Sequence, residues 1–275
     1  MELDAPDTAH ADRSANKPES LADVSFWEGY WRTTTLPSTL NLSDPPTKAL
    51  VAAIDNAIRS ELGRLAGLKV VEIGCAPGRW LAHFYALGMR PDGIEKVPEA
   101  ARLTRANLEL LGIEADIYEV DVLEVAEELE HLCGRYDVVI SLGLLEHFID
   151  PEPVLAAHAV LASPGGLVIV GVPNFRGLNG LLQKRLDPRL LGLHNTDVMS
   201  IPMLAKLAVR CGLDVSDVRY CGGFDPNLFS WEGRSYLGWV ATRFGKALRR
   251  MPRVGGRESR FWSGYLLGVF RKPRH

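Results

Sequence analysis

Residues 70–80 of this 275-residue chain read VVEIGCAPGRW. The apolar, largely β-branched start of the segment predicts a buried strand, and the residues from Arg79 onward are compatible with a helix. Gly74 and Gly78 lie in the turn between them, where the absence of a side chain lets the backbone approach a ligand closely. The segment therefore predicts the strand, turn and helix of a ligand-binding α/β domain.

The spacing of the glycines bears on the class of ligand. A dinucleotide site favours G-x-G-x-x-G, with the pyrophosphate on the helix N-terminus, whereas this chain has G-x-x-x-G. Glu72 stands just ahead of the turn, and a carboxylate there would repel a diphosphate but attract a cation. These features, with the lack of a Tyr-x-x-x-Lys pattern, disfavour the alternative of a nicotinamide-dependent oxidoreductase.

Short apolar runs alternate with longer helix-compatible runs from Leu68 onward. Such alternation is typical of a parallel sheet covered by helices. The pattern predicts strands at residues 69–73, 93–95, 115–120, 136–141, 167–172, 213–220 and 265–270. It predicts helices at residues 79–87, 98–111, 123–132, 153–161 and 201–211. Pro164-Gly165-Gly166 predicts a turn into the fifth strand.

The glycine-rich turn resembles the first motif of the class I S-adenosylmethionine-dependent methyltransferases, usually written E/D-x-G-x-G-x-G, with Ala76 where the family often has glycine. The resemblance implies that the amino-acid end of S-adenosylmethionine is held by Glu72, Gly74, Cys75, Ala76, Pro77 and Gly78. Glu95 ends the second expected strand, where a carboxylate can accept both ribose hydroxyls. Asp121 or its neighbour Val122 is expected to face the adenine, the alternative for Asp121 being a helix cap.

Two later segments resemble one branch of this family. Residues 137–151 read DVVISLGLLEHFIDP, and Leu-Glu-His followed by Asp-Pro recurs in the branch that includes the ubiquinone-pathway O-methyltransferases. Residues 161–170, LASPGGLVIV, are similar to that branch's L-x-P-G-G turn and fifth strand. The resemblance covers residues 68–172. It implies an α/β fold with a Rossmann-like, doubly wound sheet of seven strands, mostly parallel with an antiparallel last strand, and places Ser141 and Leu142 at the cofactor.

The histidine of Leu-Glu-His is the candidate for the chemistry. An alcohol must lose its proton to attack the sulfonium methyl, and His147 lies just past the fourth expected strand, so it is a candidate general base. The alternative is a histidine that only shapes the loop.

A metal site is a further possibility at this place. Relatives with E-x-x-E-H bind a divalent metal such as Mg²⁺, whereas this chain keeps Glu146 and His147 but has Gly143 at the first glutamate position. His194 is a second candidate base, metal ligand or acceptor contact, with a surface histidine as the alternative. A metal site here would therefore comprise Glu146, His147 and His194.

The chain is expected to divide into a disordered tail at residues 1–21, an N-terminal helical lid region at 22–66 and a cofactor-binding catalytic domain at 67–275. Insertions at 174–200 and 222–260 follow the fifth and sixth strands, where loops commonly carry specificity.

Side chains in the lid and in the first insertion are candidates for acceptor binding. The aromatic segment SFWEGYW at residues 25–31 includes Tyr30 and Trp31, and its alternative role is a helix pinned onto the domain. Asn174 and Arg176 suit hydrogen bonding to a polyol, which favours a sugar or glycoside hydroxyl. A phenolic, quinone-like or natural-product hydroxyl is the alternative, and a nitrogen acceptor stays open.

The composition limits the partners. A net charge of −3 gives no reason to expect nucleic acid, so the acceptor is expected to be a small molecule. Four cysteines without a C-x-x-C pair, and the lack of a signal sequence or of a long apolar run, predict a soluble cytoplasmic protein. A basic amphipathic stretch at residues 239–250 predicts a solvated helix face or, alternatively, contact with an anionic partner or membrane surface.

Overall fold

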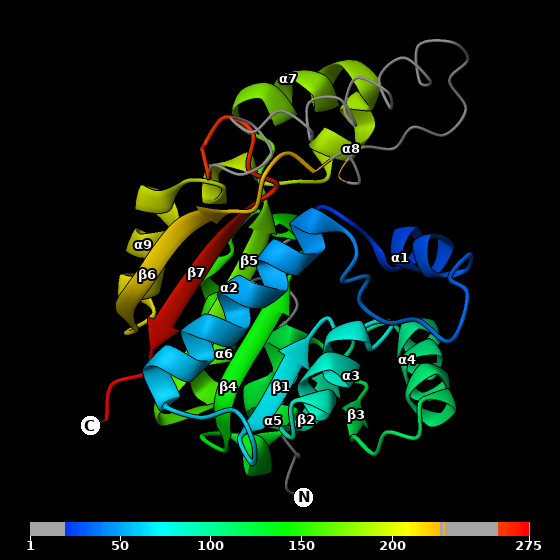
Figure 1. Cartoon of the computed structure of the whole chain (residues 1–275), viewed down its shortest axis with the longest axis vertical. Coiled ribbons are helices and arrows are strands. Elements are labelled where there is room, and N and C mark those ends of the chain that lie inside the picture. The colour runs from blue at the N-terminus through cyan, green and yellow to red at the C-terminus, as the bar shows by residue number, and fades with distance from the viewer. Residues whose placement is uncertain (1–19, 226–227, 229–257, 275) are drawn as a thin grey trace, which may run out of the picture.

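The computed structural model describes residues 20–225, 228 and 258–274. They form a seven-stranded sheet with the strand order β3-β2-β1-β4-β5-β7-β6 (Figure 1). The first five strands pair in parallel, and β7 lies antiparallel between β5 and β6. The strands are β1 (Lys69–Ile73), β2 (Arg90–Ile94), β3 (Ile117–Tyr118), β4 (Tyr136–Leu142), β5 (Ala162–Pro173), β6 (Asp214–Cys221) and β7 (Tyr265–Arg271). The expected α/β sheet, mostly parallel with an antiparallel last strand, is confirmed.

Alternate residues of the central strands face two layers of helices, as the period of a strand requires. Val70 and Val138 pack with α2 and α3 on one face. Val71 and Val139 pack with α6 and α9 on the other. The helices named here are α2 (Pro45–Leu62), α3 (Arg79–Ala86), α6 (Glu152–Leu161) and α9 (Ile201–Arg210). Burial on both faces explains why these strands are mainly apolar on both faces.

Several expected strands differ from the structure in their bounds, such as β2 at Arg90–Ile94 and β3 at Ile117–Tyr118, and two expected elements are absent. The helix expected at 123–132 is replaced by three short turns, η2 (Val122–Glu124), α5 (Val125–Glu128) and η3 (Glu130–Leu132). Glutamates repeat at helical spacing in this segment, and their mutual repulsion disfavours one continuous helix.

The turn expected at residues 164–166 is also wrong, because these residues lie within β5. The N–H of Gly165 donates to the carbonyl of Lys272 at 2.9 Å, and the N–H of Lys272 donates to the carbonyl of Gly166 at 2.9 Å. Pairing with the C-terminal residues therefore keeps the segment extended. Within it, Gly165 has a positive φ of 79°, which is irregular for a strand.

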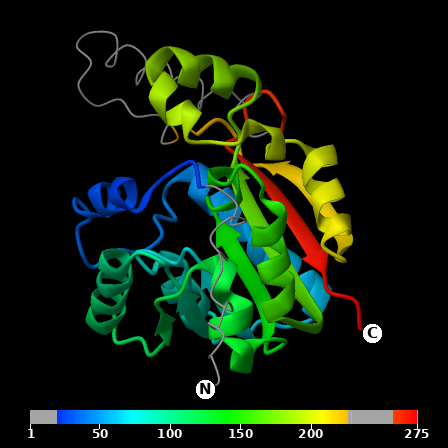
Figure 2. The same ribbon diagram turned by 180° about the vertical axis from the view of Figure 1, so that it is seen from behind.

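Three further helices stand near the carboxyl ends of the parallel strands, where loops of such sheets bind ligands. They are α1 (Val24–Trp31), α7 (Gly177–Leu186) and α8 (Pro188–Gly192). Figure 2 shows α7 and α8 beyond the ends of β4 and β5, and α1 packs on α4 (Pro98–Leu110).

The basic stretch at 239–250 and most of the expected tail lie outside the described residues. None of the helices that are described is long and apolar enough to cross a membrane.

Candidate active site

The glycine-rich turn follows β1 at the carboxyl edge of the sheet. Gly74 has a φ of 73° and Gly78 a φ of 86°, a conformation that L side chains rarely adopt. A Cβ on Gly78 would also lie 3.1 Å from a side-chain carbon of Thr104 and 3.3 Å from one of Leu108, both in α4. Glycine at these two positions is therefore required by the backbone conformation, and at Gly78 by packing as well.

Two carboxylates are buried next to this turn. Glu72 is 4% exposed and Glu95 is 7% exposed. Burial raises the pKa of both side chains, and the charge of Glu95 raises the pKa of Glu72 further. Oε1 of Glu95 accepts a hydrogen bond from the N–H of Val97 at 3.0 Å, whereas Oε2 of Glu72 has no partner among the described residues. A buried carboxylate oxygen without a partner favours a ligand that brings a cation or a hydrogen-bond donor.

Three of the other expected cofactor residues, Asp121, Val122 and Ser141, have partners within the protein. Asp121 accepts from the N–H of Leu123 at 3.1 Å and therefore caps η2, and it pairs with Lys96 at 2.8 Å. Val122 is buried in the core. The hydroxyl of Ser141 lies 2.8 Å from Nε2 of the buried His158, so this side chain contacts α6. The helix-cap alternative for Asp121 is thus present in the structure.

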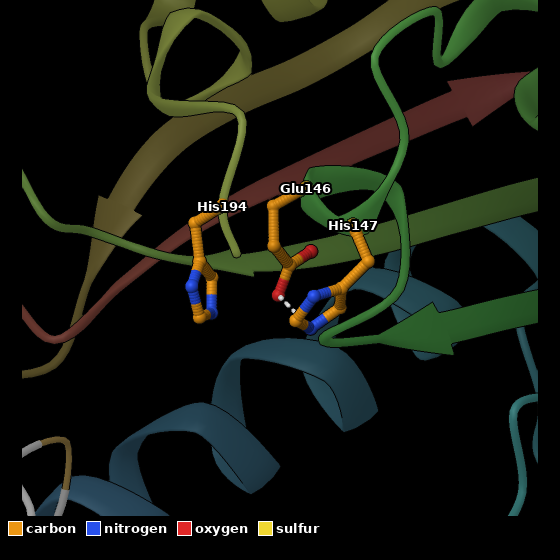
Figure 3. A group of neighbouring side chains, drawn as sticks. All are labelled: Glu146, His147 and His194. Atoms are coloured by element: carbon orange, nitrogen blue, oxygen red, sulfur yellow. Dashed lines mark ion pairs between the residues drawn. The ribbon is translucent and has the colours of Figure 1, made fainter. Parts of the chain in front are cut away.

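A cluster of three chemically active side chains follows the end of β4. Glu146 and His147 belong to the single turn η4 (Leu145–His147), and His194 follows α8 (Figure 3). One ligand atom from each residue lies within 4.8 Å of the others. Nε2 of His147 lies 3.8 Å from Oε1 of Glu146. The structure thus brings together the three residues expected to form a metal site.

Backbone hydrogen bonds hold the two parts of this cluster together. The N–H of Asn195 donates to the carbonyl of Glu146 at 2.6 Å, and its side-chain amide donates to the carbonyls of Phe148 and Ile149, each at 3.1 Å. Asn195 therefore fixes the loop of His194 against η4. No local signal in the sequence marks this role, because the side-chain partners of Asn195 lie 46 and 47 residues away in the chain.

The two imidazoles are oriented by carbonyl groups. Nδ1 of His147 donates to the carbonyl of Leu193 at 3.0 Å, and Nδ1 of His194 donates to the carbonyl of Leu190 at 2.6 Å. In each neutral ring the lone pair is therefore on Nε2. Burial and the neighbouring His194 lower the pKa of His147 to about 4. Burial raises the pKa of Glu146 to about 8, and its Oε2 has no partner among the described residues.

Gly143 lies beside the cluster and has a φ of 82°. A Cβ at this position would lie 3.6 Å from Oε1 of Glu146. The position that carries the first glutamate of E-x-x-E-H therefore adjoins the cluster, and glycine leaves the space beside Glu146 free of a side chain.

Four rings form a row through the cluster. Trp27 lies edge-on to His147 with ring centroids 4.9 Å apart, the two histidines are 4.6 Å apart, and Phe175 lies edge-on to His194 at 5.0 Å. Tyr30 and Trp31 were the expected acceptor contacts in this aromatic segment, whereas Trp27 is the residue whose ring contacts His147. The ring centroids of Tyr30 and Trp31 lie 4.8 Å apart, and the side chain of Tyr30 is largely exposed.

The polar residues expected to bind the acceptor have other partners. Asn174 is fully buried, and its amide donates to the carbonyl of Ser263 at 2.9 Å and to that of Arg260 at 3.2 Å. Arg176 is exposed and donates to the carbonyl of Thr196 at 3.4 Å. Asn174 therefore secures the segment before β7.

Residues 49–217 match the family model described as the methyltransferase domain, which covers more than half of the chain. The chain belongs to the class I S-adenosylmethionine-dependent methyltransferases. This membership excludes the nicotinamide-dependent alternative and confirms S-adenosylmethionine as the cofactor.

Two curated relatives of this methyltransferase are named ubiquinone biosynthesis O-methyltransferase. It is 32% identical over 170 residues to a ubiquinone biosynthesis O-methyltransferase of Bordetella bronchiseptica, covering 59% of this chain and 68% of the relative. It is 30% identical over 199 residues to the protein of that name from Bordetella avium, covering 68% and 79%.

Solved structures share its fold at low identity. Magnesium protoporphyrin IX methyltransferase from Synechocystis, solved with bound S-adenosylhomocysteine, has a TM-score of 0.55 at 15% identity, covering 91% of this chain and 100% of that one. The [4+2]-cyclase SpnF has a TM-score of 0.53 at 15% identity, covering 81% of both chains. At such identities the likeness concerns the fold alone, and the substrate must be argued from the site.

Proposed function

We propose that this methyltransferase methylates a hydroxyl on an aromatic ring, at a site where Glu146, His147 and His194 bind a divalent metal ion beside the cofactor. The observation that carries the proposal is the convergence of the three ligand atoms within 4.8 Å at the carboxyl edge of the sheet. A metal ion held there would polarise the acceptor hydroxyl and lower its pKa.

The donor set fits a metal ion. Both histidines have Nδ1 bound to a carbonyl, which leaves the Nε2 lone pairs available, and Oε2 of Glu146 is buried without a partner among the described residues. Two imidazoles and one carboxylate suit Mn²⁺, Co²⁺ or Zn²⁺ better than Mg²⁺, which favours oxygen ligands. Glycine at position 143 removes the further oxygen ligand that would favour Mg²⁺.

An aromatic acceptor is favoured over a sugar. The indole of Trp27 borders the cluster, and a planar acceptor can pack against such a ring. Asn174, one of the residues that suggested a sugar, has its amide bound to backbone carbonyls. The relatives' name refers to O-methylation in the synthesis of a quinone, which is consistent with a phenolic acceptor.

The chain's own residues would divide the work of methyl transfer. Glu72, Glu95 and the glycine-rich turn would hold the cofactor with its methyl toward the cluster, so that the acceptor oxygen attacks in line with the departing sulfur. α1 would exclude water, since Trp27 lies against His147.

A metal-free route, in which Nε2 of His147 takes the hydroxyl proton, is the second candidate. It is favoured by the bond between Nδ1 and the carbonyl of Leu193, which leaves Nε2 free. A pKa of about 4 makes this imidazole a weak base, however, so the metal route is the better supported one.

The cytoplasmic location expected from the sequence stays a prediction.

The test compares metal-stripped and Mn²⁺-loaded protein in methyl transfer from S-adenosylmethionine to 3,4-dihydroxybenzoate and to methyl glucoside. We expect Mn²⁺-dependent methylation of the catechol that falls at least about 100-fold in His194→Gln but persists in His131→Gln, a variant at an exposed histidine. Activity that survives chelation and is lost only in His147→Gln would favour the base route. Methylation of the glucoside alone would overturn the acceptor class.

A further inference from the structure

Asn107 is a fully buried polar side chain of α4 whose hydrogen bonds all leave its own helix. Its Oδ1 accepts from the N–H of Ser38 at 2.7 Å. Its amide donates to the carbonyl of Ser38 at 2.9 Å and to the carbonyl of Pro77 at 2.8 Å. One side chain therefore joins the glycine-rich turn of the cofactor site to a segment near the N-terminus.

A second contact ties the same two regions. Nε of Arg79, the first residue of α3, donates to Oγ of Ser38 at 2.7 Å. Ser38 is thus held through its backbone N–H, its carbonyl and its hydroxyl, and it is 9% exposed. Because Ser38 is buried, the loss of any of these partners leaves a polar group without a hydrogen bond, so breaking these hydrogen bonds is costly in free energy.

The other end of this segment is fixed at the acceptor side. The N–H of Leu21 donates to the carbonyl of His147 at 2.7 Å, and Ser20 forms an antiparallel bridge with Phe148. Between these ends, α1 packs on α4 and presents Trp27 to His147. We call residues 20–38 the N-terminal cover. It is attached to the cofactor turn at Ser38 and to the Glu146–His147 turn at Leu21.

We propose that Asn107 is a positioning residue that couples the N-terminal cover to the cofactor turn, so that cofactor binding orders the cover over the acceptor side. A ligand that restrains the turn restrains the carbonyl of Pro77, and through Asn107 the backbone of Ser38. Because such coupling is reciprocal, an ordered cover also strengthens cofactor binding. The proposal goes beyond the proposed function and requires neither a metal ion nor an acceptor.

The test is hydrogen–deuterium exchange of the full-length protein with and without saturating S-adenosylhomocysteine. In the unaltered protein we expect the amides of residues 21–31 to exchange about tenfold more slowly when the ligand is bound. Asn107→Leu removes all three bonds. Asn107→Asp removes both bonds donated by the amide but keeps an acceptor for Ser38, so it tests the coupling even if the leucine variant does not fold. Both variants are expected to bind the ligand with at least about tenfold weaker affinity and to lose the slowing at saturation.

The matched control is Asn41→Ala, which removes a local bond to the N–H of Ser43 from an exposed asparagine just beyond the cover. This variant should retain the affinity for S-adenosylhomocysteine and the slower amide exchange of residues 21–31 when the ligand is bound. Equal slowing in Asn107→Asp and in the unaltered protein would overturn the proposal, as would the absence of slowing in the unaltered protein. Loss of metal-dependent activity would leave this result unaffected, so the two proposals fail separately.

Discussion

The indole of Trp27 lies edge-on to the imidazole of His147, with ring centroids 4.9 Å apart and ring planes at 87°. Such a T-shaped pair contributes about 0.5–1.5 kcal/mol beyond the burial of its area. Trp27 belongs to α1, whereas His147 follows β4, so the contact forms only when the N-terminal cover lies over the edge of the sheet.

Replacing Trp27 therefore tests the cover at the acceptor side. We expect Trp27→Ala to lower kcat/KM for the acceptor about tenfold, because His147 loses a neighbour that orients it and excludes water. Steady-state kinetics with varied acceptor would measure the loss, and Trp27→Phe should recover most of it. Val24→Ala, on an exposed residue of the same helix, is the control. An unchanged kcat/KM in Trp27→Ala would contradict a role for this ring.

Gly143→Glu would restore the carboxylate of E-x-x-E-H beside Glu146. We expect it to raise the affinity for Mg²⁺ relative to Mn²⁺, since an added oxygen ligand favours the harder ion. The positive φ should lower the free energy of unfolding by about 1 kcal/mol. Gly134→Glu is a matched control, because Gly134 has a φ of 69° and no neighbour within 4 Å of an added Cβ. Calorimetric titration with each ion measures both variants, and equal selectivity in the two would contradict the metal site.

Glu95→Gln tests the cofactor site. The buried carboxylate accepts from the backbone at Val97 and is expected to accept from the ribose as well. We expect the dissociation constants of S-adenosylmethionine and S-adenosylhomocysteine to rise at least about tenfold, as for the loss of a charged hydrogen bond. Calorimetric titration gives both constants, with NAD as the negative ligand. Glu99→Gln, at an exposed glutamate paired with Arg102, should bind as the unaltered protein does. Tight binding by Glu95→Gln would refute the ribose contact.

His158 predicts a dependence of stability on pH. Burial lowers its pKa from 6.5 to about 4, although the hydrogen bond from Nδ1 to the carbonyl of Val154 acts in the opposite direction. The unfolded chain therefore binds the proton first on acidification. The neutral ring of His158 therefore makes its full contribution to the free energy of unfolding above pH 6.5. As the pH falls toward 4, the free energy of unfolding decreases by up to about 3 kcal/mol.

The check is urea denaturation at several pH values across that window. His158→Gln should lose less unfolding free energy than the unaltered protein between the two ends of the window, whatever its stability at neutral pH. His131→Gln, at an exposed histidine, should follow the unaltered protein. If the free energy of unfolding fell with pH by the same amount in His158→Gln and in the unaltered protein, His158 would not titrate in this window.

Local sequence was sufficient for most of the sheet. β1 has the predicted bounds, because a strand buried on both faces is mainly apolar and the glycine-rich turn marks its end. The helix expected at 123–132 was wrong: short turns replace it, in a segment whose glutamates repel one another at helical spacing. The turn at 164–166 was wrong because pairing with Lys272, which is distant in the chain, keeps that segment extended.

The sequence alone therefore established the family, the cofactor turn and the candidacy of Glu146, His147 and His194, since each depends on residues that are close along the chain or in a recurring motif. The tertiary structure decided which side chains meet. Trp27 reaches His147, Asn107 joins Ser38 to Pro77, and Asn174 binds backbone carbonyls. These contacts cross long separations in sequence and depend on which elements become neighbours when the helices pack on the sheet.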